Sequence, residues 1–151
     1  METKAKQERY QRVTAQLNEL LTVTADPVAR MATIASLLKH KFQHFFWCGY
    51  YRVYGDELVV GPYQGSIACQ ILKGGGVCWE AVKTKNPVIV PDVHEFPGHI
   101  ACDSRSNSEI CIPVFHGNEV VAVLDIDSTS FNDFDETDAA SLTEICKLIY
   151  C

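Results

Sequence analysis

The fold is indicated most clearly by the sequence V-V-A-V-L-D-I-D, residues 120–127. Apolar side chains stand at both odd and even positions of this run, which is the pattern of a strand buried on both faces. The run ends in Asp125 and Asp127, and strand periodicity places their two carboxylates on the same face. The sequence therefore predicts a sheet covered on both sides, with two acids at the end of a strand on one side.

Short turns separate two pairs of expected strands, one of which includes this run. His116-Gly117-Asn118 separates it from the preceding apolar run, and Gly55-Asp56 follows an aromatic run, so both places are expected to be antiparallel hairpins. The expected strands cover residues 45–54, 57–61, 68–72, 88–90, 110–115 and 120–127.

Helices are expected at both ends of the chain. Apolar residues recur at helical spacing before residue 22, and Asp26-Pro27 has the form of an N-cap followed by proline in the first turn of a second helix. A closing helix is expected over residues 136–150, with Asp135 or Thr137 as its cap. The order of elements predicts an α+β domain with a mainly antiparallel sheet, terminal helices on one face and a pocket under the middle segment on the other.

Length and composition limit the possible functions. With 151 residues, 47% of them apolar, the chain is expected to form one domain over residues 1–151. The net charge of -6 and the absence of a basic cluster argue against nucleic acid or an anionic membrane as a partner. The amino terminus is polar and carries no apolar signal core, so we expect a cytoplasmic protein with reduced thiols.

The seven cysteines divide into two groups. None forms the C-x-x-C spacing of a zinc site and the histidines are scattered, so no metal is expected. Cys48, Cys111 and Cys146 stand in apolar patterns and are interpreted as small buried hydrophobic residues, and Cys151 is terminal. The remaining three cysteines lie between residues 65 and 110, in a segment rich in glycine, proline and polar residues, where chemistry is more common than packing. They are Cys69, Cys78 and Cys102.

Each of these three cysteines has a suggestive neighbourhood. Cys102 follows His99, and a nearby imidazolium lowers the pKa of a thiol and makes it a better nucleophile. Gly74-Gly75-Gly76 precedes Cys78, lacks the features of a phosphate-binding loop, and is interpreted as a mobile turn that lets Cys78 or Cys69 approach another thiol.

Acids and aromatic residues suggest the walls of the pocket. Glu109 opens the strand beside Asp125 and Asp127, so the three acids either form a cluster or end their strands in solvent. Trp47 and Tyr51 are expected on one strand face together with Phe45. They either pack in the core or form an aromatic wall for an apolar or sulfur-bearing substrate group.

The motifs that contain these residues resemble, in order, those of the free methionine-(R)-sulfoxide reductases, a family of stand-alone GAF domains. The resemblance covers nearly the whole chain. The matching motifs are W-C-G-Y-Y at 47–51, L-V-V-G-P-Y-Q-G-S-I-A-C at 58–69, G-G-V-C at 75–78, D-V-H-E-F-P-G-H-I-A-C at 92–102, S-N-S-E-I at 106–110 and V-L-D-I-D-S-T at 123–129.

The resemblance implies a six-stranded antiparallel sheet, a homodimer, and reduction of free L-methionine (R)-S-oxide without metal or organic cofactor. It implies that Cys102 attacks the sulfoxide, that the resulting sulfenic acid forms a disulfide with Cys69 or, as a second candidate, Cys78, and that thioredoxin reduces this disulfide. Two departures from the family pattern are a loop between Cys69 and Cys78 that is one residue shorter, and Trp79 in place of glycine.

The resemblance also assigns the pocket residues. Glu109, Asp125 and Asp127 are expected to bind the ammonium and sulfoxide groups of the substrate, and Trp47 and Tyr51 to enclose its methyl and thioether carbons. Two alternatives are a non-catalytic GAF module that binds a small ligand, and a redox sensor that uses a disulfide between Cys69 and Cys102 as its switch.

Overall fold

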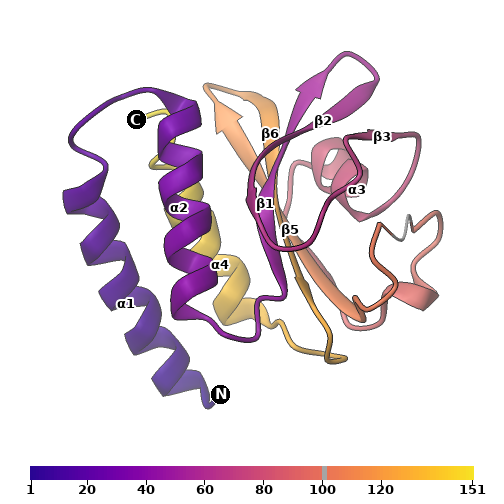
Figure 1. The fold of residues 1–151 in the computed structure, drawn as a ribbon, viewed down its shortest axis with the longest axis horizontal. Helices are drawn as coiled ribbons and strands as arrows, with labels where there is room; N and C mark the ends of the chain where they lie inside the picture. The colour runs from indigo at the N-terminus through magenta and orange to yellow at the C-terminus, as the bar shows by residue number, and fades with distance from the viewer. Residues whose placement is uncertain (100–101) are drawn as a thin grey trace.

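The computed structural model describes residues 1–99 and 102–151, so Ile100 and Ala101 of the motif before Cys102 lie outside it. One six-stranded sheet has the order β3-β2-β1-β6-β5-β4, and each neighbouring pair is antiparallel (Figure 1). The strands are β1 (Trp47–Tyr54), β2 (Glu57–Gln64), β3 (Ile71–Lys73), β4 (Val88–Val90), β5 (Ser108–His116) and β6 (Glu119–Ser128). The helices are α1 (Thr3–Leu20), α2 (Pro27–Lys41), α3 (Val77–Thr84) and α4 (Glu136–Cys146), with a 3₁₀ turn at Val93–Glu95. The predicted α+β architecture is confirmed.

Strand β6 lies at the centre of the sheet, between β1 and β5. Its residues alternate between the two faces: Leu124 and Ile126 pack in the core under the helices, and Val123 packs in the second core on the opposite face. Asp125 and Asp127 both line the pocket on the side of Val123. The sheet is therefore covered on both sides, and the two acids share one face, as the periodicity of the strand predicts.

The helical face is built from α2 and α4, which lie next to the sheet, and from α1, which forms an outer layer (Figure 1). Asp26 caps α2 by accepting a hydrogen bond from the backbone N–H of Ala29 at 2.9 Å. Asp135 caps α4 with a reciprocal capping box. Both predicted helix starts are confirmed, and both caps satisfy backbone N–H groups that the helix leaves without a partner.

An ion pair joins α1 to α4 inside this helical layer. Lys6 Nζ lies 2.8 Å from Asp138 Oδ2 and 3.2 Å from Asp135 Oδ2. The hydroxyl of Tyr10 donates a hydrogen bond of 2.6 Å to the other oxygen of Asp138. Asp138 is fully buried, and both of its oxygens have partners.

The opposite face of the sheet is covered by α3 and by the segments around it (Figure 1). A second apolar core lies there, and it includes Leu58, Trp79, Val93 and Val123. The Trp79 ring nitrogen donates a hydrogen bond of 3.2 Å to the carbonyl of Leu72, which holds α3 against β3. The middle segment of the chain thus supplies the cover that the sequence predicts for this face.

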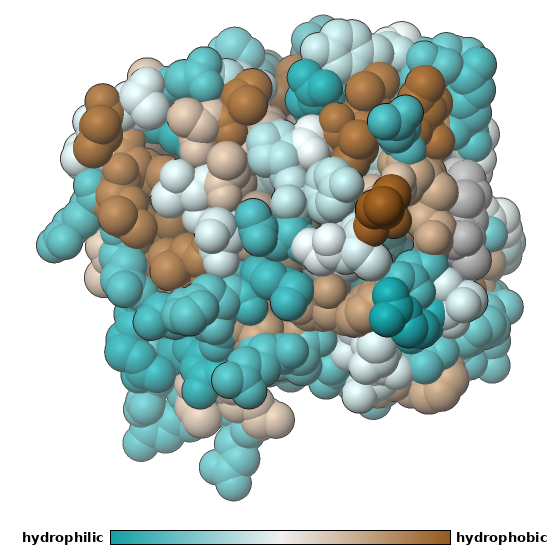
Figure 2. All heavy atoms as spheres, viewed as in Figure 1, coloured by the Kyte–Doolittle hydropathy of each residue, from teal (hydrophilic) through white to brown (hydrophobic). Residues whose placement is uncertain are grey.

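Most of the surface in view is hydrophilic, with apolar side chains near the turn between α1 and α2, at the upper left of Figure 2. Leu20, Val23 and Val28 are exposed there. Among the described residues, we find no helix with the length and apolar character needed to span a membrane.

The structure departs from the sequence-based expectations at several places. The strand expected over residues 68–72 is β3, over residues 71–73, so Cys69 precedes it. Helix α3 is not expected from the sequence: it begins directly after Gly76, and the glycine run interpreted as a mobile turn leads into this helix. Phe45 precedes β1 and packs in the helical core, because strand alternation does not extend beyond the strand.

The closing helix, expected to reach residue 150, ends at Cys146, and a turn follows it. Helix ends are set by local hydrogen bonding, which the apolar pattern does not specify.

Candidate active site

Three acids, of which Glu109 and Asp125 are buried and Asp127 is half-buried, come from adjacent positions on two strands. Glu109 of β5 lies opposite Asp127 of β6 in the strand pairing, and Cys111 lies opposite Asp125. Glu109 and Asp125 are 5% and 6% exposed, and all three acids line the same pocket. The structure thus brings together the three acids as a cluster, and the alternative of solvated strand ends does not hold for Glu109 and Asp125.

The environment of these acids favours their protonated forms. Burial raises the pKa of Glu109 well above its ordinary value, and the neighbouring Asp125 and Asp127 raise it further. Burial and the charge of Asp125 also raise the pKa of Asp127 well above the ordinary value. Removing a carboxylate from water disfavours its ionised form, and so does a like charge nearby. The cluster therefore retains protons at a pH where isolated carboxyl groups are ionised.

Within the described part of the chain, the acids have little opposing charge from the protein. The single ion-pair contact to the cluster joins His99 Nδ1 to Glu109 Oε1 at 3.9 Å. Burial lowers the pKa of His99, although the nearby Asp125 opposes this effect. The imidazole therefore loses its charge at neutral pH, and its contact with Glu109 is weak. The pocket is thus suited to a ligand that carries its own positive charge.

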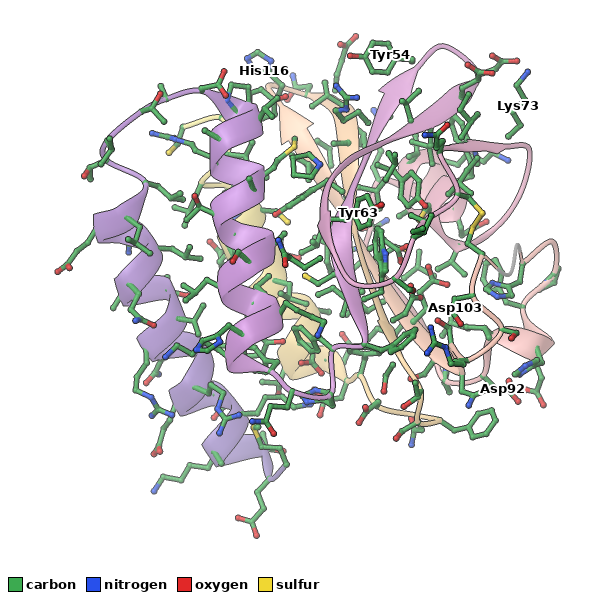
Figure 3. The ribbon with its side chains drawn as sticks, in the orientation of Figure 1. Tyr54, Tyr63, Lys73, Asp92, Asp103 and His116 are labelled. Carbon is green, nitrogen blue, oxygen red and sulfur yellow. A yellow bond between two sulfur atoms is a disulfide. The ribbon has the colours of Figure 1, made fainter. Side chains whose placement is uncertain are left out.

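Two aromatic rings form the wall beside the acids. Trp47 and Tyr51 of β1 line the pocket, with their ring centroids 5.9 Å apart. Trp47 also stacks on Tyr63, which Figure 3 labels, at 5.2 Å. A Cβ atom on Gly49 would lie 2.2 Å from the Cβ of Tyr63, so β1 and β2 can approach this closely only with glycine at that position.

The same two aromatic side chains hold the segment that carries the first loop cysteine. The ring nitrogen of Trp47 donates a hydrogen bond of 3.0 Å to the Ser66 carbonyl, and the hydroxyl of Tyr51 donates one of 3.0 Å to the Cys69 carbonyl. The rings of Trp47 and Tyr51 are therefore buried in the core and also line the pocket.

A disulfide joins Cys69 to Cys102 across 33 residues of sequence, with a Cα–Cα distance of 5.5 Å. Cys102 lines the pocket and is exposed to solvent. The next residue, Asp103, accepts hydrogen bonds from Ser66 at 2.9 Å and from Arg105 at 2.7 Å. The Ser66 contact joins the Cys102 segment to the Cys69 segment, and the Arg105 contact lies within the Cys102 segment. In Figure 3 the yellow bond between sulfur atoms lies on the same side of the sheet as Asp103.

Cys78, the second candidate partner of Cys102, has a different environment. It lies in the first turn of α3, is buried, and is not part of a disulfide. Its sulfur lies 3.4 Å from that of Cys111. The hydrogen bond with Cys111 lowers the pKa of Cys78, but burial and nearby Asp125 outweigh it and raise this pKa to about 12.

Cys111 lies directly beside the acids, a position that sequence reasoning did not give it. It is buried in the apolar core of this face, as expected, and its sulfur also lies 3.4 Å from Asp125 Oδ1 and 3.6 Å from Glu109 Oε2. Burial raises its pKa well above the ordinary value. The available signal was its position two residues after Glu109 on a strand, which places both side chains on one face.

Comparisons with known proteins agree with this geometry. The GAF domain family matches residues 11–149. GAF domain-containing protein A of Dictyostelium discoideum is 46% identical, over 96% of this chain and 92% of that protein. Free methionine-R-sulfoxide reductase of Escherichia coli is 40% identical, over 93% of this chain and 86% of that protein.

A solved structure extends the comparison to three dimensions. The free methionine-R-sulfoxide reductase of Neisseria meningitidis, in complex with its substrate, superposes with a TM-score of 0.89 at 42% identity, covering 93% of this chain and 86% of that chain. The shared family model, the sequence identity and the close structural match lead to one assignment. The chain belongs to the GAF domain family and, within it, to the family of the free methionine-R-sulfoxide reductases.

Proposed function

We propose that this chain reduces free methionine-R-sulfoxide to methionine and oxidises Cys102 and Cys69 to a disulfide. One observation carries the proposal: the disulfide lies at a pocket that also contains three acids and two aromatic rings. Its relatives named for this reaction support the choice of substrate.

The pocket offers complementary partners for the ammonium group and for the apolar carbons of the free amino acid. The acids of β5 and β6 attract the ammonium group, since the protein supplies them with little positive charge within its described residues. Trp47 and Tyr51 offer apolar rings to the terminal methyl and the adjacent carbons, in contacts that sulfur-bearing chains favour. A methionine inside a peptide lacks the free ammonium group, so the cluster of acids favours the free amino acid.

The chemistry balances with two thiols and one sulfoxide. The Cys102 thiolate attacks the sulfoxide sulfur and forms a transient sulfur–sulfur bond, and the sulfoxide oxygen takes up one proton. This oxygen then moves from the substrate sulfur to the Cys102 sulfur as the sulfur–sulfur bond breaks, so methionine leaves and Cys102 becomes a sulfenic acid. The Cys69 thiol then attacks the Cys102 sulfur and releases water as the disulfide forms. The sulfoxide gains two electrons and the two thiols lose them.

The raised pKa values of Glu109 and Asp127 bear on the first step. A protonated carboxyl group can donate a hydrogen bond to the sulfoxide oxygen and then transfer its proton as negative charge develops there. We assign this role to the cluster, with Asp125 as a further contact for the substrate. Such a donor explains why acids stand in a pocket used by a thiolate, where ionised carboxylates would repel it.

Cys69 is the proposed resolving residue, and Cys78 is the second candidate. The disulfide with Cys69 supports the first assignment, and the burial of Cys78 in α3 argues against the second. Mass mapping of the disulfides formed after one turnover in wild type and in Cys69→Ser tests the assignment. A Cys78–Cys102 bridge in the wild-type enzyme would contradict it.

The proposal includes recycling by thioredoxin in the cytoplasm. The exposed position of Cys102 supports it, because an external thiolate must reach one sulfur of the disulfide to reduce it. We also propose a homodimer, supported by the exposed Leu20, Val23 and Val28 near the turn between α1 and α2. Light scattering of the purified chain tests the dimer, with a monomer mass of 16.8 kDa as the contrary result.

The decisive experiment measures methionine release from three substrates: free methionine-R-sulfoxide, its S epimer, and a peptide-bound R form, each with dithiothreitol as reductant. We expect turnover of the free R epimer alone. Turnover of the peptide form at a similar rate would contradict the role of the ammonium group. No turnover of any form by protein with titrated, reduced thiols would favour a ligand-binding GAF module.

A further inference from the structure

A second group of side chains lies beside the proposed redox pair. Cys78 of α3, Glu109 and Cys111 of β5, and Asp125 of β6 each offer one sulfur or oxygen atom, and these four atoms lie within 4.8 Å of one another. All four residues are buried. The proposed reaction uses the carboxyl groups but assigns no role to Cys111, so the arrangement of two thiols with two acids needs its own explanation.

The distances match those between the ligands of a tetrahedral zinc ion. With zinc–sulfur and zinc–oxygen bonds of about 2.3 and 2.1 Å, ligand atoms at tetrahedral angles lie about 3.4–3.8 Å apart. The two sulfurs of Cys78 and Cys111 are 3.4 Å apart. The Cys111 sulfur is also 3.4 Å from Asp125 Oδ1 and 3.6 Å from Glu109 Oε2. Little movement of the ligand atoms is needed to surround the ion.

The charge of the site is an independent observation that points to a cation. Apart from His99 at 3.9 Å from Glu109, no cationic side chain is within ion-pair distance of Glu109, Asp125 or Asp127 in residues 1–99 and 102–151. Buried carboxyl groups normally have a positive partner or coordinate a metal. Thiol and carboxyl ligands together select a thiophilic divalent ion of borderline softness, of which Zn²⁺ is the best match.

We propose that Cys78, Glu109, Cys111 and Asp125 form a Zn²⁺ site, and that the bound ion prevents methionine sulfoxide from using Glu109 and Asp125. The proposed inhibition of methionine sulfoxide reduction rests on the proposed function, whereas the binding of Zn²⁺ does not. The sequence conceals the site because its ligands come from three elements and have none of the short spacings typical of zinc motifs.

Binding must release protons. Both thiols lose a proton when they become zinc ligands, and so does any carboxyl group that was protonated. The affinity for Zn²⁺ is therefore expected to rise with pH, with at least two protons released per ion.

The form of the protein that contains the Cys69–Cys102 disulfide is suited to the binding test. Cys78 and Cys111 are free thiols while Cys69 and Cys102 are joined in the disulfide. Protein in this state cannot bind zinc through the latter pair. A Cys151→Ser background removes the remaining exposed thiol.

The first experiment titrates this disulfide form with Co²⁺ and then displaces the Co²⁺ with Zn²⁺ in competition with a chromophoric chelator. We expect one ion per chain, a sulfur-to-cobalt charge-transfer band and tetrahedral cobalt bands. Cys111→Ser and Cys78→Ser should each weaken binding by about 100-fold or more, because each removes a thiolate ligand.

Cys146→Ala is the matched control, because it removes a buried thiol from the core on the other face of the sheet. Its Zn²⁺ affinity should equal that of the background protein. Unfolding midpoints in urea establish that each variant is folded. Binding without the charge-transfer band, or equal affinity in the control and in Cys111→Ser, would overturn the proposed site.

The second experiment tests inhibition by single turnover. The protein is first reduced with a phosphine, and the phosphine is then removed under anaerobic conditions. The reduced protein is mixed with free methionine-R-sulfoxide, with or without one equivalent of Zn²⁺, and the methionine formed is measured. We expect Zn²⁺ to suppress the reaction in wild type, and to have much less effect on the Cys111→Ser variant relative to its own zinc-free rate.

Equal inhibition of both proteins would place the inhibitory zinc on reduced Cys69 and Cys102, and would overturn the proposed block. No methionine from either protein without zinc would reject the proposed function alone, and the cobalt and zinc titrations would still decide the metal site.

Discussion

Carboxyl groups are buried on both faces of the sheet, but the charges around them differ. On the helical face, Asp138 is fully buried and meets Lys6 at 2.8 Å and the Tyr10 hydroxyl at 2.6 Å. On the pocket face, Glu109 lies among other acids, and its one ion-pair contact within the described residues is His99 at 3.9 Å. The same chemical group is thus neutralised by the protein on one face and left to like-charged neighbours on the other.

The difference separates a structural role from a functional one. A buried carboxylate with a cation and a hydroxyl donor is satisfied by its own chain, so it can hold α1 against α4. Buried acids without such partners cost folding free energy unless they keep protons or receive a cation from outside. The pocket face is therefore the part of the molecule that is arranged for a ligand.

The largest effect should come from the thiol at the pocket. Cys102→Ser should lower methionine release by about 10³-fold or more, because a hydroxyl is a far weaker nucleophile than a thiolate. The exposed Cys151→Ser is the matched control and should keep wild-type activity. Steady-state release from free methionine-R-sulfoxide measures both. A Cys102→Ser rate near that of wild type would reject the assignment of the nucleophile.

On the helical face, Asp138→Asn should lower the free energy of unfolding by about 3 kcal/mol, because it leaves the Lys6 ammonium with only Asp135 as a charged partner. Urea unfolding measures the loss. Lys6→Met in the Asp138→Asn background should recover part of it, since no charge then remains buried. If Asp138→Asn instead abolished turnover in fully folded protein, the separation between the two faces would be wrong.

Neutralising the pocket acids should lower activity without lowering stability, the reverse of the effect of Asp138→Asn. Glu109→Gln and Asp127→Asn should each lower kcat/KM by about 10- to 100-fold through loss of proton donation and substrate contact. Their free energies of unfolding should stay level or rise, because each removes a carboxyl group from a buried acidic cluster. Kinetics and urea unfolding on the same samples test both statements. Lower stability with unchanged kinetics would assign these acids to structure.

The pH dependence of stability gives a smaller effect with a defined sign. The pKa of Glu109 is raised above its ordinary 4.5, so the folded protein holds this proton more tightly than the unfolded chain does. The contribution of this group to the free energy of unfolding is full below pH 4.5. It is lost as pH rises through the raised pKa, with a slope of at most about 1.4 kcal/mol per pH unit. Glu109→Gln should flatten this decline. Parallel urea-unfolding curves for the two proteins across that range would contradict the expectation.

The smallest expected effect is that of Tyr51→Phe. It removes the hydrogen bond to the Cys69 carbonyl and keeps the aromatic wall, so stability should fall by about 1 kcal/mol. Disulfide formation after one turnover should slow a few-fold, because the Cys69 segment is held less firmly. Rapid-quench thiol titration measures that rate, and Tyr54→Phe, at an exposed tyrosine, is the control.

Much of this fold is predictable from local patterns. The apolar run of β6, the Asp26-Pro27 helix start and the hairpin turns act over a few residues, and the structure has all of them. Helix α3 is missed because a short helix after a glycine run has too few residues for a clear periodic pattern. The start of β3 is missed because the position of the Cys69 segment depends on a hydrogen bond to Tyr51, which is distant in sequence.

The candidate site was predictable in part. Strand alternation alone places Asp125 and Asp127 on one face. The composition of residues 65–110 singled out the three loop cysteines, the start of the neighbouring strand singled out Glu109, and the family resemblance assigned their roles. The position of Cys111 under these acids was not anticipated, because an apolar strand pattern does not distinguish a thiol in a core from a thiol that contacts carboxyl groups.

Most of the elements, the two-sided burial of the sheet and the kinds of side chain available for chemistry follow from periodicity and residue type, which can be read along the chain. Which groups meet depends on how the elements pack. The disulfide joins Cys69 and Cys102, which are 33 residues apart in sequence, and Cys78 of α3 contacts Cys111 of β5. Such contacts arise from packing of distant segments, and so do the raised pKa values of the acids, because burial and mutual repulsion exist only after the strands and helices have assembled.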